Sequence, residues 1–578
     1  MAASHLAVEI PKLFLKMVPI MNLRRFLTGW FLLAAVVTGK PLFAAPPIET
    51  LARVHWQGLN QVSTSSNATQ FMKVWRLPLS KALETQTLDK FSQAPWRWLH
   101  RNIDTNAAAL LRPLLDDLVA DESYLQIRSV TGRPAEWALA IRLDERRAAL
   151  WQTNLAVTLE SLTGIRPDPA TSGHYGWSLT KHHDPNLIEL TRVGGWTVVG
   201  AAEDFNGLIA DLRARTQRAL PPWNVRNGSD WLEADLNPAQ LLSYLTNAGS
   251  GAVWWGEATD EPASLHQSDA TTAREDSRPT EIGKADHYPV PTRLYLAING
   301  NGDNVLTHAT ADFSRPLALE LKPWNIPTNL IHGPLTSFTA ARGIAPWLGT
   351  LPAWQKLEFT PPPDQAWLWS QAGTPFQTYF AAPLPGASNQ VWQLSKRLLQ
   401  NGNLWLAAHA QGNFQWATDP GRVVWNDALV ISPWLVGRNE NQKDYLMAGL
   451  YAIEPGDLDV PSQDMLHTVL NTTNLVFYQS ERTGSRVEDS FFITQLFRVV
   501  FKKAQLPPDA KATAWLKGVE SQLGTSTTLV TETGPAQLSF ARESAVGFTS
   551  LELHLLGDWL ESPDFPRGLH TFRAPPQQ

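Results

Sequence analysis

The strongest constraint on the fold is that short runs of alternating apolar and polar residues come in pairs around turns. Tyr124–Val130 and Trp137–Leu143 lie on either side of a turn rich in Gly and Pro, and Leu187–Val193 and Trp196–Gly200 flank Gly194-Gly195. A period of two is typical of a strand with one buried face. Two such runs joined by a short turn predict an antiparallel hairpin.

Helical patterns alternate with these hairpins. A helix is predicted from Leu79 to about Asn102, and Asp144 is a suitable N-cap for a helix that Gly164 would end. Phe205–Arg218 has its apolar residues on one helical face. The sequence therefore predicts an α+β fold with mixed and antiparallel sheets and packed helices.

A weak internal repeat indicates that units of the β-β-α kind have been duplicated. Residues 71–79, 231–239 and 338–347 each read as a strand, a proline and the start of a helix. Proline suits the first turn of a helix because it has no N–H to leave unsatisfied. Such corners are also common in unrelated α/β chains, so ancestry and coincidence both stay open.

Composition excludes several classes of protein. The 578 residues are 43% hydrophobic and 18% charged and include no cysteine. Disulfides, thiolate metal sites and thiol nucleophiles are therefore impossible. The net charge of −6 provides no global basic field, so we expect no nucleic-acid partner.

The N-terminal residues have the order of a secretory signal peptide. Basic residues around Arg24 precede the apolar run Phe26–Gly39, and cleavage is expected after Ala44. Met21 offers an alternative start, and an uncleaved anchor is the alternative interpretation of residues 1–44. We expect a periplasmic or secreted bacterial protein without a membrane span after signal cleavage, because no later run reaches about 20 apolar residues.

A change in composition divides the remaining chain. Residues 257–291 contain almost no aliphatic side chains and are predicted to form a polar, flexible insertion or linker. The expected organisation is an N-terminal α+β domain at 45–256 and a C-terminal α+β domain at 292–578.

Short motifs in the C-terminal part support a resemblance to other proteins. Trp324–Ile331, Arg342–Leu348 and Val546–Thr549, which leads to Asp558-Trp559-Leu560, resemble segments of uncharacterised secreted bacterial proteins of similar length. The resemblance implies export and implies no particular activity.

One cluster of histidines is a candidate metal site. His174, His182, His183 and Asp184 carry groups that can bind zinc. The same residues read as a solvated loop between two strands, with no fourth ligand nearby. Phosphate-binding, dinucleotide-binding and zinc-protease motifs are absent from the sequence, and we expect no cofactor.

Tryptophan is the other candidate for binding. Of the 25 tryptophans, Trp367 and Trp369 have the spacing that puts two side chains on one face of a strand. The two indoles would form either a platform for a glycan or part of the core.

These patterns favour a non-catalytic protein of the bacterial envelope that binds or scaffolds an unknown ligand or partner. Two alternatives remain open. One is a secreted hydrolase or binder of a cell-wall glycan, and the other is a periplasmic carrier of an apolar ligand. The absence of known catalytic motifs argues against an enzyme.

Overall fold

The computed structural model describes residues 48–99, 101–130, 136–170, 175–181, 184–202, 214–215, 228–241, 290–372, 377–418, 421–451, 463–501, 503, 506–507, 509–563 and 565–566. The expected signal peptide at 1–44 and nearly all of the polar segment at 257–291 lie outside these residues. Within the described residues, no helix combines the length and apolar character needed to cross a bilayer.

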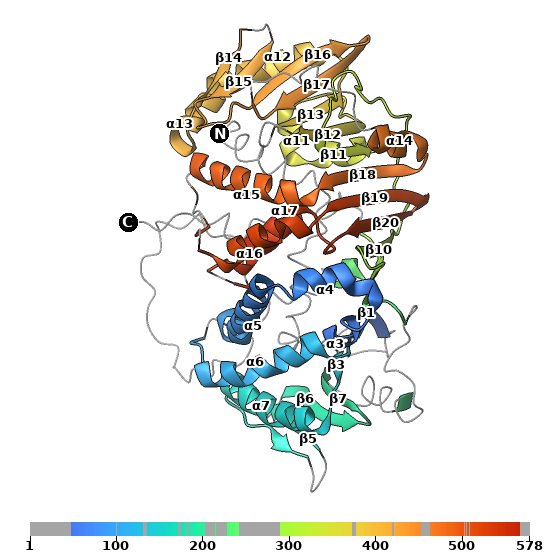
Figure 1. Cartoon of the computed structure of the whole chain (residues 1–578), viewed down its shortest axis with the longest axis vertical. Coiled ribbons are helices and arrows are strands. Elements are labelled where there is room, and N and C mark those ends of the chain that lie inside the picture. The colour runs from blue at the N-terminus through green and yellow to red at the C-terminus, as the bar shows by residue number, and fades with distance from the viewer. Residues whose placement is uncertain are drawn as a thin grey trace, which may run out of the picture.

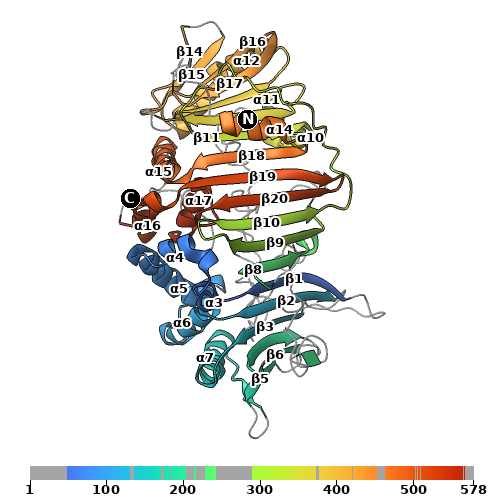
Figure 2. The ribbon, with the colours of Figure 1, turned by 45° about the vertical axis from the view of Figure 1, so that its right-hand side comes forward.

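Twenty strands of the described chain form one continuous sheet, and every neighbouring pair is antiparallel (Figure 2). The predicted α+β class is confirmed. From one edge to the other the strand order is β4 (Asp168–Pro169), β5 (Gly176–Lys181), β6 (Asp184–Val193), β7 (Trp196–Ala202), β3 (Glu136–Arg142), β2 (Ser123–Val130), β1 (Ile48–Trp56), β8 (Leu232–Leu236), β9 (Arg293–Gly300), β10 (Val305–Asp312), β20 (Gln537–Ser544), β19 (Thr525–Gly534), β18 (Leu475–Arg482), β11 (Leu335–Arg342), β12 (Gln365–Gln371), β13 (Thr378–Pro383), β17 (Lys443–Gly449), β16 (Trp434–Glu440), β15 (Arg422–Asn426) and β14 (Asn413–Trp416).

This order is the same ten-strand arrangement used twice. The first repeat runs 4-5-6-7-3-2-1-8-9-10, and the second runs 14-15-16-17-13-12-11-18-19-20. Bulges occur at matching places as well. The register of β1 against β2 shifts between Thr50 and Ala52, and that of β11 against β12 shifts between Leu335 and Ser337. We infer that the chain is a tandem duplication of one α+β unit.

The two repeats meet where β10 pairs with β20. The matching bulges make Trp56 equivalent to Ala341. The strand pairings followed outward from these two residues make Thr307 equivalent to Phe540, and therefore His308 equivalent to Ala541. His308 and Ala541 also pair directly with each other. A pseudo-two-fold axis normal to the sheet therefore passes between them. By the strand order, β9 and β10 belong to the first repeat, although they follow the polar segment in the sequence.

Helices pack mainly on one face of the sheet, called here the helix-covered face (Figures 1 and 2). Val54, Leu125, Leu139 and Val199 lie opposite one another on that face and pack against two helices in one core cluster. The described helices are α3 (Leu59–Val62), α4 (Thr69–Trp75), α5 (Pro78–Trp98), α6 (Thr105–Ala120), α7 (Glu145–Thr163), α10 (Ala345–Thr350), α11 (Pro352–Leu357), α12 (Ala387–Arg397), α13 (Asn403–His409), α14 (Gln463–Asn471), α15 (Thr483–Val500), α16 (Lys511–Val519) and α17 (Ser550–Leu560).

Helix α7 forms where the capping residues predicted it. The Asp144 side chain accepts the Arg147 N–H at 2.7 Å, and Gly164 ends the helix with a φ of 74°. Helix α4 contradicts the expectation of a strand at 71–76. Its aromatic and β-branched residues suggest a strand by propensity, but Met72 and Val74 point to different sides of the helix and are each buried in a separate core cluster.

The opposite face of the second repeat carries its own core. Phe338, Trp369, Tyr379 and Tyr478 belong to this cluster, which also takes in residues of the segment 324–331 and of α14. Helices of the two repeats also pack against each other on the helix-covered face. Helix α5 of the first repeat packs on α16 and α17 of the second, where the Trp515 indole N–H donates to Ser80 Oγ at 2.9 Å.

Candidate functional site

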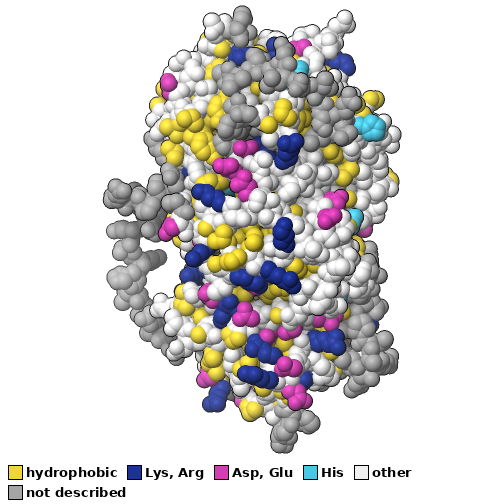
Figure 3. Space-filling model, viewed as in Figure 1, with side chains coloured by type: hydrophobic (Ala, Val, Ile, Leu, Met, Phe, Trp, Pro, Cys, Tyr) yellow, Lys and Arg dark blue, Asp and Glu magenta, His cyan; other side chains and the backbone are white. Residues whose placement is uncertain are grey.

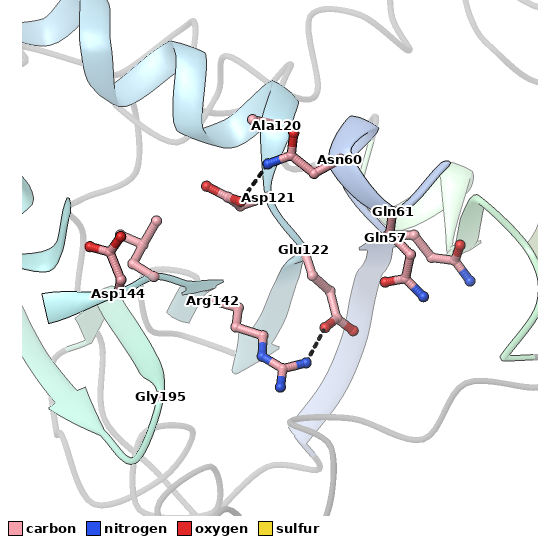
Figure 4. Close-up of a pocket in the computed structure, with 10 residues that line it drawn as sticks. Gln57, Asn60, Gln61, Ala120, Asp121, Glu122, Arg142, Asp144 and Gly195 are labelled. Carbon is pink, nitrogen blue, oxygen red and sulfur yellow. Dashed lines mark hydrogen bonds and ion pairs between the residues drawn. The ribbon is translucent and has the colours of Figure 1, made fainter. Parts of the chain in front are cut away.

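A polar pocket of about 350 Å³ opens in the first repeat, where the ends of β1, β2 and β3 meet α3, α6 and α7 (Figure 4). Its size lies within the range of small-ligand sites. Its charged and amide side chains are those of Gln57, Asn60, Gln61, Asp121, Glu122, Arg142 and Asp144. Register puts Gln57, Glu122 and Arg142 at the edge of the face opposite the helix-covered face.

Backbone geometry brings the wall of the pocket together. Gly58 follows β1 with a φ of 84°, a conformation that favours glycine. A Cβ on Gly58 would lie 2.5 Å from the Asp121 carbonyl carbon, so the glycine also allows two backbone segments to touch. Asp121 directly follows α6, and Asp144 lines the pocket while it caps α7.

Glu122 is the most connected carboxylate of the pocket. Its Oε1 lies 3.1 Å from His55 Nε2 and accepts the Tyr124 hydroxyl at 3.2 Å, and Oε2 accepts from Arg142 at 3.4 Å. Burial by itself would raise the pKa of Glu122. The contacts with His55, Tyr124 and Arg142 outweigh burial and lower that pKa below the ordinary value.

Asp121 is shifted in the other direction. Burial raises the pKa of Asp121 above its ordinary value, against the opposing effect of the Asn60 amide, which donates to Oδ1 at 3.1 Å. Two neighbouring carboxyls of one pocket therefore differ in their affinity for a proton. Asp121 holds its proton more tightly, and Glu122 stays ionised to a lower pH.

The lining has the chemistry of a binding pocket for polar or cationic groups. It presents three carboxyls, three side-chain amides and one guanidinium, and the residues that line it include no Ser, Thr, Cys or Lys. A nucleophile of the activated hydroxyl, thiol or amine type is therefore missing from this lining. Within the described residues, no group of three or more His, Asp and Glu side chains is placed to hold a metal ion.

The histidine cluster predicted from sequence falls mostly outside the described residues. The residues outside are His174, His182 and His183. The backbone of Asp184 is described as the first residue of β6, where it pairs with Lys181. The zinc site therefore stays a prediction.

Trp367 and Trp369 lie in the core of the second repeat. They are 1% and 0% exposed, and the Trp369 ring stacks on Tyr379 at 5.4 Å. Indoles without exposed surface offer no platform to a glycan. A different pair is exposed: Trp392 of α12 and Trp416 of β14 are 40% and 36% exposed and stack at 4.4 Å.

Sequence reasoning missed the pocket residues. Asp121-Glu122 stands between a helix and a strand, a place where a pair of acidic residues reads as an ordinary solvated turn. The available signal was Gly58, a glycine directly after a strand and before an apolar helical run. That signal becomes informative when the same glycine is found at Gly343, after the equivalent strand of the second repeat.

Protein-family models, curated proteins and solved structures provide no match to this chain.

Proposed function

We propose that this chain is an exported, non-catalytic binding protein of the bacterial envelope that holds its ligand in the pocket of the first repeat. The observation that carries the proposal is the lining, which holds three carboxyls and three amides but no hydroxyl, thiol or amine nucleophile. Such a lining suits a ligand that forms hydrogen bonds and carries a positive charge. It gives no support to an apolar ligand.

The surroundings of the pocket suit binding without large motion. Its walls come from strand ends of a continuous sheet, from the ends of α3 and α6, and from the N-terminus of α7, which Asp144 caps. The face in Figure 3 carries acidic and basic side chains interspersed around apolar patches, so attraction of a charged ligand there would depend on a local pocket.

A substitution that fills the pocket tests the proposal. An added Cβ at Gly195 meets no atom within 4 Å, and Gly195 has no positive φ, so Gly195→Leu adds a large side chain to the lining of the pocket with little backbone strain. We expect a ligand to co-purify with the natural protein from its envelope and to be lost from this variant. Native mass spectrometry measures both.

Gly534→Leu is the matched control, because a Cβ there meets Gln537 Cβ at an ordinary 3.8 Å far from the pocket. The control should retain the ligand. Retention of the same ligand by Gly195→Leu would contradict the proposal, provided that both variants keep the circular dichroism spectrum of the natural protein.

The opposite pKa shifts of Asp121 and Glu122 favour one alternative, a hydrolase acting on a cell-wall glycan. Such enzymes use one carboxylic acid that stays protonated and a second carboxylate that is ionised. Under this alternative, Asp121→Asn and Glu122→Gln would each lower the release of soluble sugars from purified cell walls by about a hundredfold or more. Absence of any release by the natural protein would exclude it.

A further inference from the structure

The second repeat contains the counterpart of the pocket, and there the position is filled. Gly58 and Gly343 both end the first strand of their repeat with positive φ, at 84° and 70°. The residues just before them, Gln57 and Arg342, are therefore equivalent. Trp56 pairs with Ser123 while Ala341 pairs with Ala366, which makes Asp121 equivalent to Asp364 and Glu122 equivalent to Gln365.

Two further contacts support the equivalence at the far wall of the pocket. The Leu143 N–H donates to the Gly195 carbonyl at 3.2 Å, and the Leu384 N–H donates to the Asp444 carbonyl at 2.9 Å. The aromatic rings behind the wall match as well. Tyr124 meets Trp196 edge-on at 5.4 Å, and Trp367 meets Tyr445 edge-on at 6.3 Å.

The segment Lys322–Asn325, called here the plug, occupies the counterpart. Gln365 binds its backbone at two points, since Oε1 accepts the Asn325 N–H at 2.8 Å and Nε2 donates to the Pro323 carbonyl at 2.8 Å. The Arg342 guanidinium donates to the Lys322 carbonyl at 3.0 Å and stacks on the Trp324 ring at 4.7 Å.

The Tyr445 hydroxyl completes the contacts by donating to the Asn325 carbonyl at 3.2 Å. The plug is thus bound by Gln365, Arg342 and Tyr445. Their equivalents in the first repeat are Glu122, Gln57 and Trp196, and both Glu122 and Gln57 line the pocket. The fold position is thus built to hold an extended polypeptide, and in the second repeat the chain supplies that polypeptide itself.

Charge distinguishes the two copies. Burial raises the pKa of Asp364, and the charge of Lys322 in the plug opposes this effect, while the Lys322 ammonium itself pairs with Glu320 at 3.2 Å. The equivalent Asp121 shares its pocket with Glu122 and Asp144, and Arg142 is the one basic side chain in the lining. The lining therefore carries more acidic than basic side chains, which favours a ligand with a basic group such as a lysine.

We propose that the pocket of the first repeat binds an extended, lysine-bearing polypeptide segment of a partner protein, held as the second repeat holds its plug. The inference rests on the proposed binding function and names its ligand. Glu122 would accept a backbone N–H of the segment, because an ionised carboxylate offers about four acceptor sites and the described contacts use three. Asp121 would pair with the lysine.

A capped hexapeptide with the sequence of residues 321–326, Leu-Lys-Pro-Trp-Asn-Ile, is the probe. Isothermal titration calorimetry with the full processed chain should show saturable binding of one peptide per chain. Asp121→Asn should weaken this binding about tenfold, and replacement of the peptide lysine by norleucine should do the same. The two changes together should also cost about tenfold, because each removes the same charge pair.

Two further variants sharpen the test. Asp364→Asn is the matched control in the filled copy and should leave peptide affinity unchanged. Glu122→Gln recreates the amide found at Gln365, which can donate to a peptide carbonyl as a carboxylate cannot. It should therefore bind the norleucine peptide more tightly than the natural protein does.

Additive losses of about a hundredfold in the double change, or an equal effect of Asp364→Asn, would overturn the pairing of lysine with Asp121. Equal affinity for lysine amide and for the hexapeptide would show that the pocket takes a small amine, and would overturn the polypeptide. Loss of a co-purified ligand in Gly195→Leu, without any peptide binding, would overturn this inference and leave the proposed binding function standing.

Discussion

Arg498 and Asp558 join α15 to α17 through an ion pair between side chains that are 1% and 0% exposed. Removal of one partner of a buried pair leaves the other charge without compensation in a medium of low polarity. We expect Asp558→Leu to lower the free energy of unfolding by about 3–5 kcal/mol, measured by urea denaturation.

Asp235→Leu is the comparison, because Asp235 forms an ion pair with the half-exposed Arg293. Exposed pairs contribute about 0–1 kcal/mol. A loss at Asp558 no larger than the loss at Asp235 would show that the buried pair does not hold the two helices together.

His554 makes stability depend on pH. It is 2% exposed, and burial lowers its pKa below 6.5, an effect that Asp558 opposes and Arg498 reinforces. The folded state therefore keeps the ring neutral at a pH where the unfolded chain protonates it, so stability falls as the pH drops below about 6.5.

In His554→Leu this contribution is absent. The natural protein should lose about 1 kcal/mol more of its free energy of unfolding than the variant between pH 7.5 and pH 5.5. Urea denaturation at both pH values measures the difference. A parallel loss in both proteins would mean that His554 is protonated in the folded state.

At the scale of the element, the two glycines that end β1 and β11 differ in their surroundings. A Cβ on Gly58 would lie 2.5 Å from backbone atoms of Asp121, while a Cβ on Gly343 would meet the Leu321 side chain at 3.1 Å. Both positions have positive φ, which costs alanine about 1–2 kcal/mol. Backbone cannot move aside as the end of a leucine can.

Gly58→Ala should therefore destabilise the protein by about 3 kcal/mol or more, and Gly343→Ala by about 1–2 kcal/mol. Differential scanning calorimetry of the two variants provides the comparison. Gly58→Ala should also weaken peptide binding, because Asp121 would move. Equal thermal stabilities would mean that the contact of Gly58 with Asp121 is not tight.

Sequence patterns predicted elements well where local chemistry decides them. The cap at Asp144 and the glycine at Gly164 predicted α7, and the two runs on either side of residues 131–135 predicted the β2–β3 pair. The failure at α4 has a physical cause. Phe71 and Trp75 favour a strand by propensity, and packing against Trp231 and its neighbours overrides that preference.

At the scale of the molecule, β10 and β20 join the two repeats in the sheet. His308 has a paired strand on each side, facing Ala297 and Ala541. Proline there removes a ladder hydrogen bond to one neighbour and disturbs both. His308→Pro should lower the free energy of unfolding by about 3 kcal/mol or more.

Gln415→Pro in β14 is the control, because β14 is an edge strand of the described sheet with one paired neighbour. Its cost should be clearly smaller. Chemical denaturation of the two variants measures the loss in free energy of unfolding that each proline causes. A similar cost at both positions would argue against β10 and β20 as the joint that holds the repeats together.

The sequence by itself determined the class of the fold and many of its elements, because caps, turn residues and alternating patterns act over a few neighbouring residues. It also determined that cysteine chemistry is impossible. Tertiary structure alone decided that the hairpins join into one sheet with a pseudo-two-fold axis. Strand pairing over hundreds of residues leaves little trace in local pattern when the two repeats have diverged.

The pocket belongs to the same category. Three strand ends meet there and bring together Asp121, Glu122 and Gln57. Comparison with the equivalent residues of the second repeat, Asp364, Gln365 and Arg342, indicates what kind of ligand they bind. The tryptophans show the reverse case. Spacing put Trp367 and Trp369 on one face of a strand, but burial of that face under residues distant in sequence decided that they serve the core.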